Sequence, residues 1–374
     1  MRILVVGAGI AGLTFAWWAR RCGHVPVVAE RAASLRDAGY MIDFYGGGLD
    51  VAERMGIGPD LERLHYPIPR LRFVDGRGAE RYSIRYPVIR RRLFGDRHYN
   101  FMRGDLERLL YERIAEDVEV RFGAAVDGAT ECDDTVEVHF ADGSAEAFDL
   151  VVGADGVHSA LRRKLDSRPP RFLGYRAAAF VVQEELLPPA ERDAFSTLTV
   201  PGRQVSVYPI GGGRTATFFL RHERERLGDR SPAALQRELA EHYGDLAWLV
   251  PELIAAAMRD PDPYFDDVLQ VETPAWSRGR LVLLGDAAWC VSLLGGQGAS
   301  LAMLGASVLA EEIPALGRYE QKLRGLTSRK QAVGRSMGRW LVPPTPFQLV
   351  LRDLFFRVSV WPGVSRIVRA RAFA

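Results

Sequence analysis

The sequence predicts an α/β fold in which a Rossmann-like nucleotide-binding domain carries an inserted β-sheet domain and a helical C-terminal tail. Three observations support this prediction. The first thirty residues read as a strand, a glycine turn, a helix and a second strand. Residues 172–220 show strand patterns without a second glycine motif, which suits a separate sheet. Residues 318–374 are helical in parts and are interrupted by PPTP at 343–346.

The N-terminal unit is predicted element by element. Residues 3–6 (ILVV) form a continuous apolar run, which is typical of a strand buried on both faces. A helix is expected over 10–22 and a second strand over 25–30. The apolar start behind Met1 and Arg2 resembles a short signal peptide. The glycines at fixed turn positions, and the helix and strand that follow, favour a βαβ unit instead.

The turn of this unit has the pattern G-x-G-x-x-G. Gly7 permits the tight turn, Gly9 lets the backbone approach a pyrophosphate, and Gly12 lets the helix pack closely on the strand. The N-terminus of the helix supplies N–H donors and a partial positive charge to a phosphate. Glu30 ends the second strand, where a carboxylate accepts hydrogen bonds from a ribose 2′-hydroxyl. The predicted nucleotide contacts in this unit are Gly7, Gly9, Ala11, Gly12, Glu30 and Arg31.

A second segment, LVLLGDAAWCVSLLGGQGAS at 281–300, favours FAD over NAD. Asp286 follows a buried strand and can accept hydrogen bonds from a ribityl chain. The glycines allow close backbone approach, and the next helix directs N–H groups at the pyrimidine edge of a flavin. Taken alone, the segment could also be a glycine-rich loop with a helix-capping Asp. The predicted cofactor contacts here are Gly285, Asp286, Gly296, Gly298 and Ala299.

The remaining patterns divide the chain into domains. Helical spacing is evident over 104–116, 231–258 and 298–313, and strand patterns lie between the first two of these. The nucleotide-binding pieces are therefore not contiguous. We expect the nucleotide-binding domain over 1–70, 100–165 and 275–320, the β-rich domain over 71–99 and 166–274, and the helical tail over 321–374.

Charge and cysteine usage set further expectations. The formal net charge is only +2, so nothing global favours nucleic acid. Ten arginines lie within 70–103, either as a solvated surface or as a rim that attracts an anionic substrate or an NADPH phosphate. Three scattered cysteines fit neither a disulfide framework nor a metal site, so we expect no metal and a reducing cytoplasm.

No run of about 18 apolar residues is present, so no membrane-spanning helix is expected. The stretch from Phe347 onward is apolar with interspersed arginines. It could be a basic amphipathic helix that binds a membrane or a partner. The favoured interpretation is that it packs on the nucleotide-binding domain with its arginines in water. We expect no membrane, no nucleic acid and no obligate protein partner.

These motifs resemble those of the class A flavoprotein monooxygenases, the group of para-hydroxybenzoate hydroxylase and the tetracycline-inactivating monooxygenases. Three fingerprints agree in order across most of the chain: GAGIAG at 7–12, Asp155 and Gly156 in VVGADGVHSALR, and Gly285 with Asp286. The resemblance implies a Rossmann-like FAD-binding domain with an inserted β-sheet substrate domain.

The resemblance also implies roles for single residues. Arg103 matches the family arginine that contacts FAD before a helix. Arg36 and Asp43 match an Arg-x6-Asp pair linked to NADPH and FAD in the tetracycline-degrading members, although a surface loop could supply both by chance. Asp155 is associated in the family with FAD and NADPH contacts, with a strand-end turn residue as the alternative interpretation.

The chain departs from the family pattern after Asp286. Trp289 stands where the family has His, residues 291–294 (VSLL) contain no proline, and Ser300 replaces the usual Asn. Without proline the loop is freer, and the leucines make it more apolar. This departure bears on oxygen activation and not on FAD binding.

The implied activity is that of an FAD-dependent monooxygenase. FAD would be reduced by NADPH or NADH as a transient co-substrate, would capture O2 as a C4a-hydroperoxide, and would hydroxylate a hydrophobic or aromatic small molecule. Tyr208, Phe218 and Leu293 are the substrate-pocket candidates, and the aromatic ones could instead be core residues. Two alternatives stay open: an FAD-dependent dehydrogenase or reductase, and an FAD-binding protein with a non-redox role.

Overall fold

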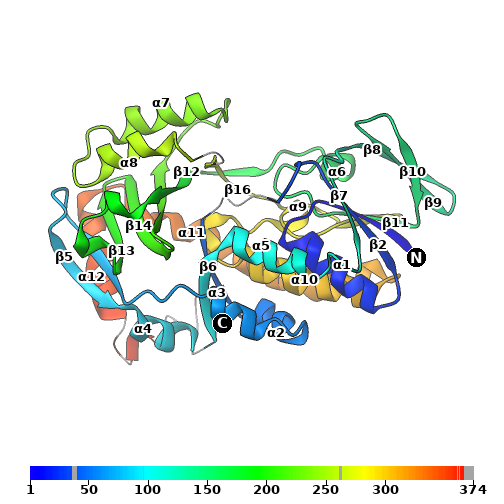
Figure 1. Ribbon diagram of the computed structural model, residues 1–374, viewed down its shortest axis with the longest axis horizontal. Coiled ribbons are helices and arrows are strands. Elements are labelled where there is room, and N and C mark those ends of the chain that lie inside the picture. The colour runs from blue at the N-terminus through cyan, green and yellow to red at the C-terminus, as the bar shows by residue number, and fades with distance from the viewer. Residues whose placement is uncertain (36–39, 96, 261–262, 360, 362, 366–374) are drawn as a thin grey trace.

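The computed structural model describes residues 1–35, 40–95, 97–260, 263–359, 361 and 363–365. Figure 1 shows two halves, with a twisted sheet and its helices on the right and a larger sheet with helices on the left. This arrangement confirms the predicted α/β fold class with an inserted sheet and a helical C-terminal region.

The right half is built on a six-stranded sheet that is parallel except at one edge. Its strands run in the order β17-β18-β11-β1-β2-β7. The apolar run predicted at 3–6 forms its centre, and Ile3, Leu4 and Val5 are fully buried. Helices cover one face of the sheet, and the antiparallel strands Thr135–Phe140 and Ala145–Phe148 pack against the other. The bounds are β1 Arg2–Val6, β2 Val25–Glu30, β7 Glu119–Phe122, β11 Leu150–Gly153, β17 Ser277–Arg278 and β18 Leu281–Leu283.

The strand order places the sequence motifs side by side. β1 pairs in parallel with β2 on one side and with β11 on the other, and β11 pairs in parallel with β18. The carboxyl ends of parallel strands lie at the same edge of a sheet, and ligands bind where the strand order reverses. The glycine motif after β1, Asp155 after β11 and Asp286 after β18 therefore emerge at one edge.

Helices α1 (Ile10–Arg21), α5 (Arg103–Glu112) and α10 (Gly298–Glu312) lie along one face of this sheet (Figure 1). Gly12 in α1 is required by the close helix–strand approach, since a Cβ there would lie 2.0 Å from the Gly7 carbonyl oxygen. The helices predicted at the N-terminus and over 298–313 are thus present within a residue of their expected bounds.

The left half is a seven-stranded sheet in the order β16-β12-β15-β14-β13-β4-β5. One face packs on α7 (Pro232–Tyr243) and α8 (Val250–Ala257) through an apolar cluster. Residues 231–258, which we expected to be helical, form these two helices. The first ends at Gly244, where a Cβ would lie 2.4 Å from the Ala240 carbonyl oxygen. The strands are β4 Arg70–Val74, β5 Glu80–Arg85, β12 Arg171–Gln183, β13 Ala194–Val200, β14 Arg203–Gly211, β15 Arg214–His222 and β16 Tyr264–Gln270.

Smaller elements complete the two halves. Two strands, β3 and β6, pair antiparallel, and β8, β9 and β10 form a three-stranded sheet. The bounds are β3 Met41–Tyr45, β6 His98–Met102, β8 Val126–Cys132, β9 Thr135–Phe140, β10 Ala145–Phe148, α2 Gly47–Arg54, α3 Gly58–Leu64, α4 Tyr86–Ile89, a π-helical turn Arg90–Phe94, α6 Ala160–Leu165, α9 Asp286–Trp289 and short 3-10 turns at Glu184–Leu186, Pro189–Glu191 and Leu293–Gly295.

The tail corrects one expectation. Helix α11 (Leu316–Leu341) packs against the nucleotide-binding half through Tyr319 and continues to the inserted sheet. Helix α12 (Pro346–Ser359), which we expected on the nucleotide-binding domain, packs on the inserted sheet instead. There Arg352 donates to the Thr199 hydroxyl at 3.0 Å, and the Tyr82 hydroxyl donates to Asp353 at 3.0 Å. These buried polar contacts specify the inserted sheet as its partner.

Candidate active site

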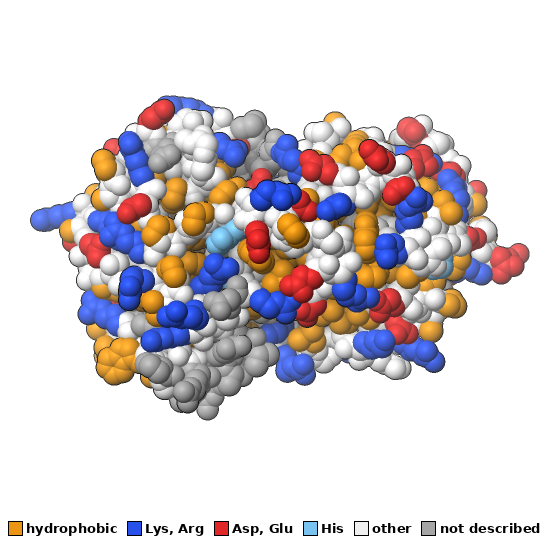
Figure 2. All heavy atoms as spheres, turned by 60° about the horizontal axis from the view of Figure 1, so that its bottom comes forward, with side chains coloured by type: hydrophobic (Ala, Val, Ile, Leu, Met, Phe, Trp, Pro, Cys, Tyr) orange, Lys and Arg blue, Asp and Glu red, His pale blue; other side chains and the backbone are white. Residues whose placement is uncertain are grey.

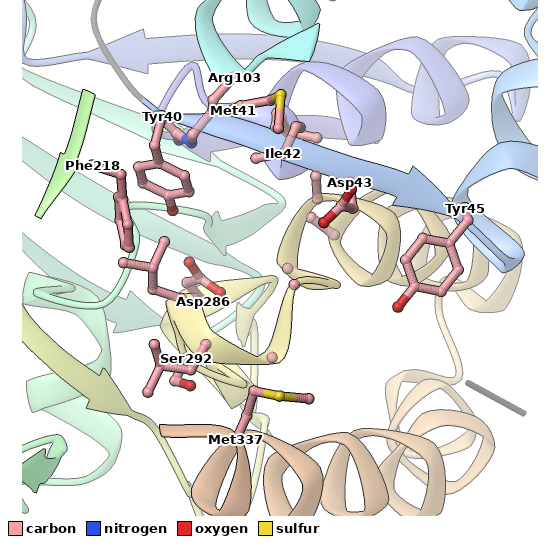
Figure 3. Close-up of a pocket in the computed structure, with 18 of the residues that line it drawn as sticks. Tyr40, Met41, Ile42, Asp43, Tyr45, Arg103, Phe218, Asp286, Ser292 and Met337 are labelled. Atoms are coloured by element: carbon pink, nitrogen blue, oxygen red, sulfur yellow. The ribbon is translucent and has the colours of Figure 1, made fainter. Parts of the chain in front are cut away.

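A cavity of about 420 Å3 lies between the two halves. Segments far apart in the sequence meet there, and Figure 3 shows Asp43 and Tyr45 on β3, Met337 on α11, and Asp286 and Arg103 facing the same space. The lining residues are Gly9, Ile10, Ala11, Tyr40, Met41, Ile42, Asp43, Tyr45, Phe94, Arg103, Ala154, Gly156, Phe195, Gln204, Tyr208, Phe218, Asp286, Ser292, Leu293, Leu294, Gly295, Gly296, Gly298, Ala299, Ala302, Met337 and Leu341.

One side of the cavity is formed by the carboxyl ends of the parallel strands and by the starts of two helices. We call it the strand-end wall, and define it as Gly9, Ala11, Arg103, Gly156, Asp286, Gly296, Gly298 and Ala299. A Cβ added at Gly296 or Gly298 would meet no atom within 4 Å, so the backbone there is open to the cavity. Helices α1 and α10 both begin at this wall. The free N–H groups and partial positive charge at a helix N-terminus suit an anionic ligand such as a pyrophosphate.

Arg103 supplies a fixed positive charge to the strand-end wall. Its guanidinium forms an ion pair with Glu107 at 2.6 Å, and the Glu107 side chain is only 6% exposed. The negative charge of Glu107 raises the pKa of Arg103, so the guanidinium stays protonated. Because Glu107 holds the guanidinium from behind, its remaining N–H groups can face a ligand in the cavity.

Asp286 lies on the same wall in a different electrostatic setting. Its side chain is open to the cavity but surrounded by protein atoms. This enclosure raises the pKa of the Asp286 carboxyl, and the nearby charge of Arg103 offsets the effect only in part. The carboxyl can therefore accept, and when protonated donate, hydrogen bonds to a polyhydroxylated ligand.

Asp43 lies at the edge of the strand-end wall, and the pKa of its carboxyl is shifted in the opposite direction to that of Asp286. One carboxylate oxygen accepts hydrogen bonds from Asn100 Nδ2 at 2.5 Å, His98 Nε2 at 3.0 Å and the Tyr86 hydroxyl at 3.2 Å. Burial would raise the pKa of Asp43, but the hydrogen bonds from His98, Asn100 and Tyr86 together bring it below its usual value. Its side chain is 42% exposed, so a charged oxygen remains accessible from the cavity.

The other side of the cavity is largely hydrophobic. We call it the apolar wall, and define it as Phe195, Gln204, Tyr208, Phe218, Leu293, Leu294, Met337 and Leu341. Phe195 and Tyr208 stack with ring centroids 4.8 Å apart. The Tyr208 hydroxyl accepts a hydrogen bond from the Met41 backbone N–H at 2.8 Å, which ties the inserted sheet to β3. All three predicted substrate-pocket residues lie on this wall.

Six predicted cofactor residues do not line the cavity: Gly7, Gly12, Glu30, Arg31, Asp155 and Gly285. Gly7 and Gly285 have positive φ angles of 109° and 63°, as their turns require. Glu30 accepts hydrogen bonds at 2.9 Å from the backbone N–H groups of Ala8 and Ala32, so it braces the glycine turn. Arg31 is exposed. Arg36 lies outside the described residues.

Asp155 has a clear structural task. Its Oδ2 accepts a hydrogen bond from the Ala160 backbone N–H at 2.7 Å, at the start of α6. Its Oδ1 is buried and has no hydrogen-bond partner in the described part of the chain. The neighbouring Ala154 and Gly156 line the cavity. Asp155 therefore orients the turn after β11, and its Oδ1 stays buried without a hydrogen-bond partner among the described residues.

The departures from the family pattern are explained by packing. Trp289 is 3% exposed and lies 4.4 Å from the ring of Trp276, so it fills the core beneath α10. Ser300 donates to the Tyr45 carbonyl at 2.6 Å and accepts from the Gly48 N–H at 2.9 Å, which fixes α10 against α2. Ser292 is buried with a φ of 81°, so the proline-free loop holds a strained position at the cavity.

Sequence reasoning missed part of the lining. Tyr40, Tyr45, Phe94, Gln204, Met337 and Leu341 all face the cavity without having been predicted to do so. Met337 and Leu341 are four residues apart on one helix, so their spacing places them on one face but does not say what that face meets. No local pattern marks Gln204 in β14 or Phe94 at the end of the π-helical turn.

The arginines within 70–103 differ in their surroundings. Arg103 lines the cavity, Arg72 is buried against Glu191, and Arg97 pairs on the surface with Asp50 at 2.7 Å. Figure 2 shows basic side chains predominating over acidic ones on the half that carries the inserted sheet. Arg85 and Arg91 are exposed at α4 and the π-helical turn, without an ion pair in the described residues.

No helix among the described residues combines the length and the apolar character needed to cross a bilayer. No group of three or more His, Cys, Asp or Glu side chains in these residues could hold a metal ion.

Comparisons with known proteins agree with this geometry. A family model described as FAD binding domain matches residues 1–331. An uncharacterised protein of Mycobacterium tuberculosis is 33% identical over 344 residues, covering 88% of this chain and 91% of that protein. A flavin-dependent monooxygenase of Legionella longbeachae is 31% identical over 355 residues, covering 89% of this chain and 88% of that protein.

Solved structures show the same fold. The tetracycline destructase Tet(51) is 27% identical with a TM-score of 0.85, and the match covers 100% of this chain and 99% of that one. Klebsiella pneumoniae HpxO, in complex with FAD and uric acid, is 27% identical with a TM-score of 0.78, and the match covers 100% of this chain and 98% of that one. With its strand-end motifs gathered at one cavity, the chain belongs to the FAD-binding-domain family of flavin-dependent monooxygenases and is an FAD-dependent oxidoreductase.

Proposed function

We propose that this enzyme uses NADPH or NADH and O2 to hydroxylate a hydrophobic or aromatic small molecule. The observation that carries the proposal is the division of one cavity into a polar strand-end wall and an apolar wall. A flavin monooxygenase needs both, because the cofactor is anionic and polyhydroxylated while an aromatic substrate must be held away from water.

The strand-end wall has the chemistry to hold FAD. The N-termini of α1 and α10 and the charge of Arg103 would bind the pyrophosphate. Asp286 would accept hydrogen bonds from the ribityl chain, and Glu30 would accept them from the ribose. Asp43 keeps a carboxylate oxygen accessible for the cofactor or the nicotinamide nucleotide, and Asp155 orients the turn after β11. FAD, when bound, would accept electrons from NAD(P)H and transfer one oxygen atom from O2.

The apolar wall has the chemistry to hold the substrate. Tyr208, Phe218 and Leu293 would contact it, and Met337 with Leu341 would close the cavity from α11. These side chains would exclude water from the reacting centre and leave few competing hydrogen-bond partners. The uric acid in HpxO is a flat ring system, which supports a flat substrate here.

NAD(P)H would bind transiently, because the chain contains a single G-x-G-x-x-G motif. The exposed Arg85 and Arg91 offer positive charge for its phosphates. One alternative is a flavin enzyme that oxidises its substrate without inserting oxygen, since residues 291–294 at the cavity lack the proline of the family pattern. The two activities differ in the origin of the product's oxygen.

The experiment is to mix the purified yellow protein with NADPH or NADH in air and to follow the flavin spectrum with and without candidate aromatic substrates. The proposal predicts bleaching of the flavin, faster with a substrate, and one labelled oxygen in the product when isotopically labelled O2 is supplied. Product formation without labelled oxygen would support the dehydrogenase. An absence of bleaching under all conditions would contradict both.

A further inference from the structure

The apolar wall contains one amide among its apolar side chains. Gln204 lies in β14 and lines the cavity, although the residue is only 8% exposed. In a strand, alternate residues face the same side. Gln204, Ser206 and Tyr208 therefore lie on the cavity side of the sheet, and Gln204 and Tyr208 line the cavity. Val205 and Val207 face the apolar cluster under α7 and α8.

The orientation of the amide is set by its neighbours on the sheet. Gln204 Nε2 donates to the Ser206 hydroxyl oxygen at 3.2 Å, and Ser206 shares a hydrogen bond of 3.0 Å with the Thr197 hydroxyl. Ser206 is fully buried and Thr197 is 6% exposed, so this chain of hydrogen bonds is shielded from bulk water. The amide nitrogen is thereby engaged within the sheet.

The amide oxygen has no such partner. Within the described residues, no hydrogen bond reaches Gln204 Oε1, and this atom is not among the fully enclosed polar atoms, so it opens to the cavity. The other polar group of this wall, the Tyr208 hydroxyl, is already bonded to Met41. A carbonyl oxygen in largely apolar surroundings favours a ligand that supplies a hydrogen-bond donor to it.

We propose that Gln204 is a specificity-determining residue that accepts a hydrogen bond from a hydroxyl or amino group on a flat, otherwise apolar substrate. The inference rests on the proposed function, since Gln204 would contact the substrate of the same cavity. A site built around a hydrogen bond rejects an analogue that lacks the donor, because the buried acceptor is then left unpaired.

The test compares four probes of one ring system on the FAD-loaded protein: naphthol, naphthylamine, methoxynaphthalene and naphthalene. Dissociation constants come from the change in the flavin's visible spectrum. We expect naphthol and naphthylamine to bind roughly tenfold or more tightly than methoxynaphthalene. Gln204→Leu should remove this preference while naphthalene binds as before.

Two further variants separate the role of the amide from general damage. Ser206→Ala frees the amide and should reduce the preference without abolishing it, and Gln204→Glu should restore it for naphthylamine. The matched control is Gln183→Leu, the same substitution at an exposed position of β12 in the same sheet, which should keep the wild-type preference. Flavin content confirms that each variant is folded.

Three outcomes would overturn the inference: equal binding of naphthol and methoxynaphthalene, a preference that survives Gln204→Leu, or no spectral response to any probe. Tighter binding of methoxynaphthalene would also contradict it, since the amide nitrogen would then face the cavity. None of these measurements requires turnover. A wild-type preference without oxygen insertion would therefore leave the inference standing while the proposed function failed.

Discussion

The two walls of the cavity are built by different rules. The glycines and Asp286 of the strand-end wall follow three strands that are adjacent in one parallel sheet, so they occupy positions that the topology dictates. Arg103 joins them from the start of α5. The apolar wall combines the inserted sheet, the loop after α9 and helix α11, whose contributions are ordinary side chains. The first wall is thus specialised for one cofactor, and the second can change its ligand by changing few residues.

The largest expected effect is at the glycine motif. Gly12→Val should abolish FAD binding, because a Cβ at this position lies 2.0 Å from the Gly7 carbonyl oxygen and must displace α1 or the turn. The measurement is flavin released per polypeptide after denaturation. Gly317→Val is the matched control, since Gly317 is exposed and a Cβ there meets no atom within 4 Å. Full flavin content in Gly12→Val would contradict the role of this turn.

Arg103 should give the next largest effect. Arg103→Ala removes the charge at the strand-end wall and breaks the ion pair of Glu107, which is only 5% exposed. We expect FAD affinity to fall roughly a hundredfold and the free energy of unfolding to drop by about 3 kcal/mol. Fluorescence titration of the apoprotein and urea unfolding measure the two effects.

A double variant separates them. Arg103→Ala with Glu107→Gln also removes the buried charge of Glu107, so stability should largely recover while FAD affinity stays low. Recovery of both would mean that Arg103 acts only by neutralising Glu107 and does not contact the cofactor.

The two carboxylates of the cavity should respond in opposite directions to pH. The lowered pKa of Asp43 contributes stability above its unfolded pKa, which is about 3.9, and this stability is lost as pH falls through the folded pKa. The raised pKa of Asp286 contributes stability at low pH, and this is lost as pH rises through the folded pKa.

At neutral pH, Asp43→Asn should therefore lower the free energy of unfolding of the apoprotein by about 1 kcal/mol, because His98, Asn100 and Tyr86 lose a charged acceptor. Asp286→Asn should leave it unchanged or raise it slightly, since it removes an enclosed charge. Urea unfolding of both apoproteins decides the matter. Equal destabilisation by both variants would contradict the opposite pKa directions of Asp43 and Asp286.

The smallest effect on the cofactor is expected from the apolar wall. Phe218→Ala should change FAD affinity less than about twofold, since Phe218 faces the substrate side, while the binding of naphthalene weakens roughly tenfold. Titrations of FAD and of the probe on the same variant measure both. A large loss of FAD affinity would mean that the two walls do not act independently.

This difference also explains how far the sequence could predict the site. Gly9, Asp286 and Gly298 were predictable because backbone approach and helix N-termini require particular residues at particular spacings. Gln204, Met337 and Leu341 were not, because nothing in β14 or α11 says which surface will face them across the cavity. The position of α12 was wrong for the same reason: its partner is chosen by Arg352 and Asp353, whose contacts are distant in sequence.

The most direct measurement of the central claim is the flavin spectrum of the purified protein before and after NADPH or NADH is added in air. The account predicts a yellow protein with bound FAD that bleaches on reduction and recovers its colour as O2 is consumed. A protein that copurifies without flavin, and whose spectrum does not change when FAD is added, would contradict it.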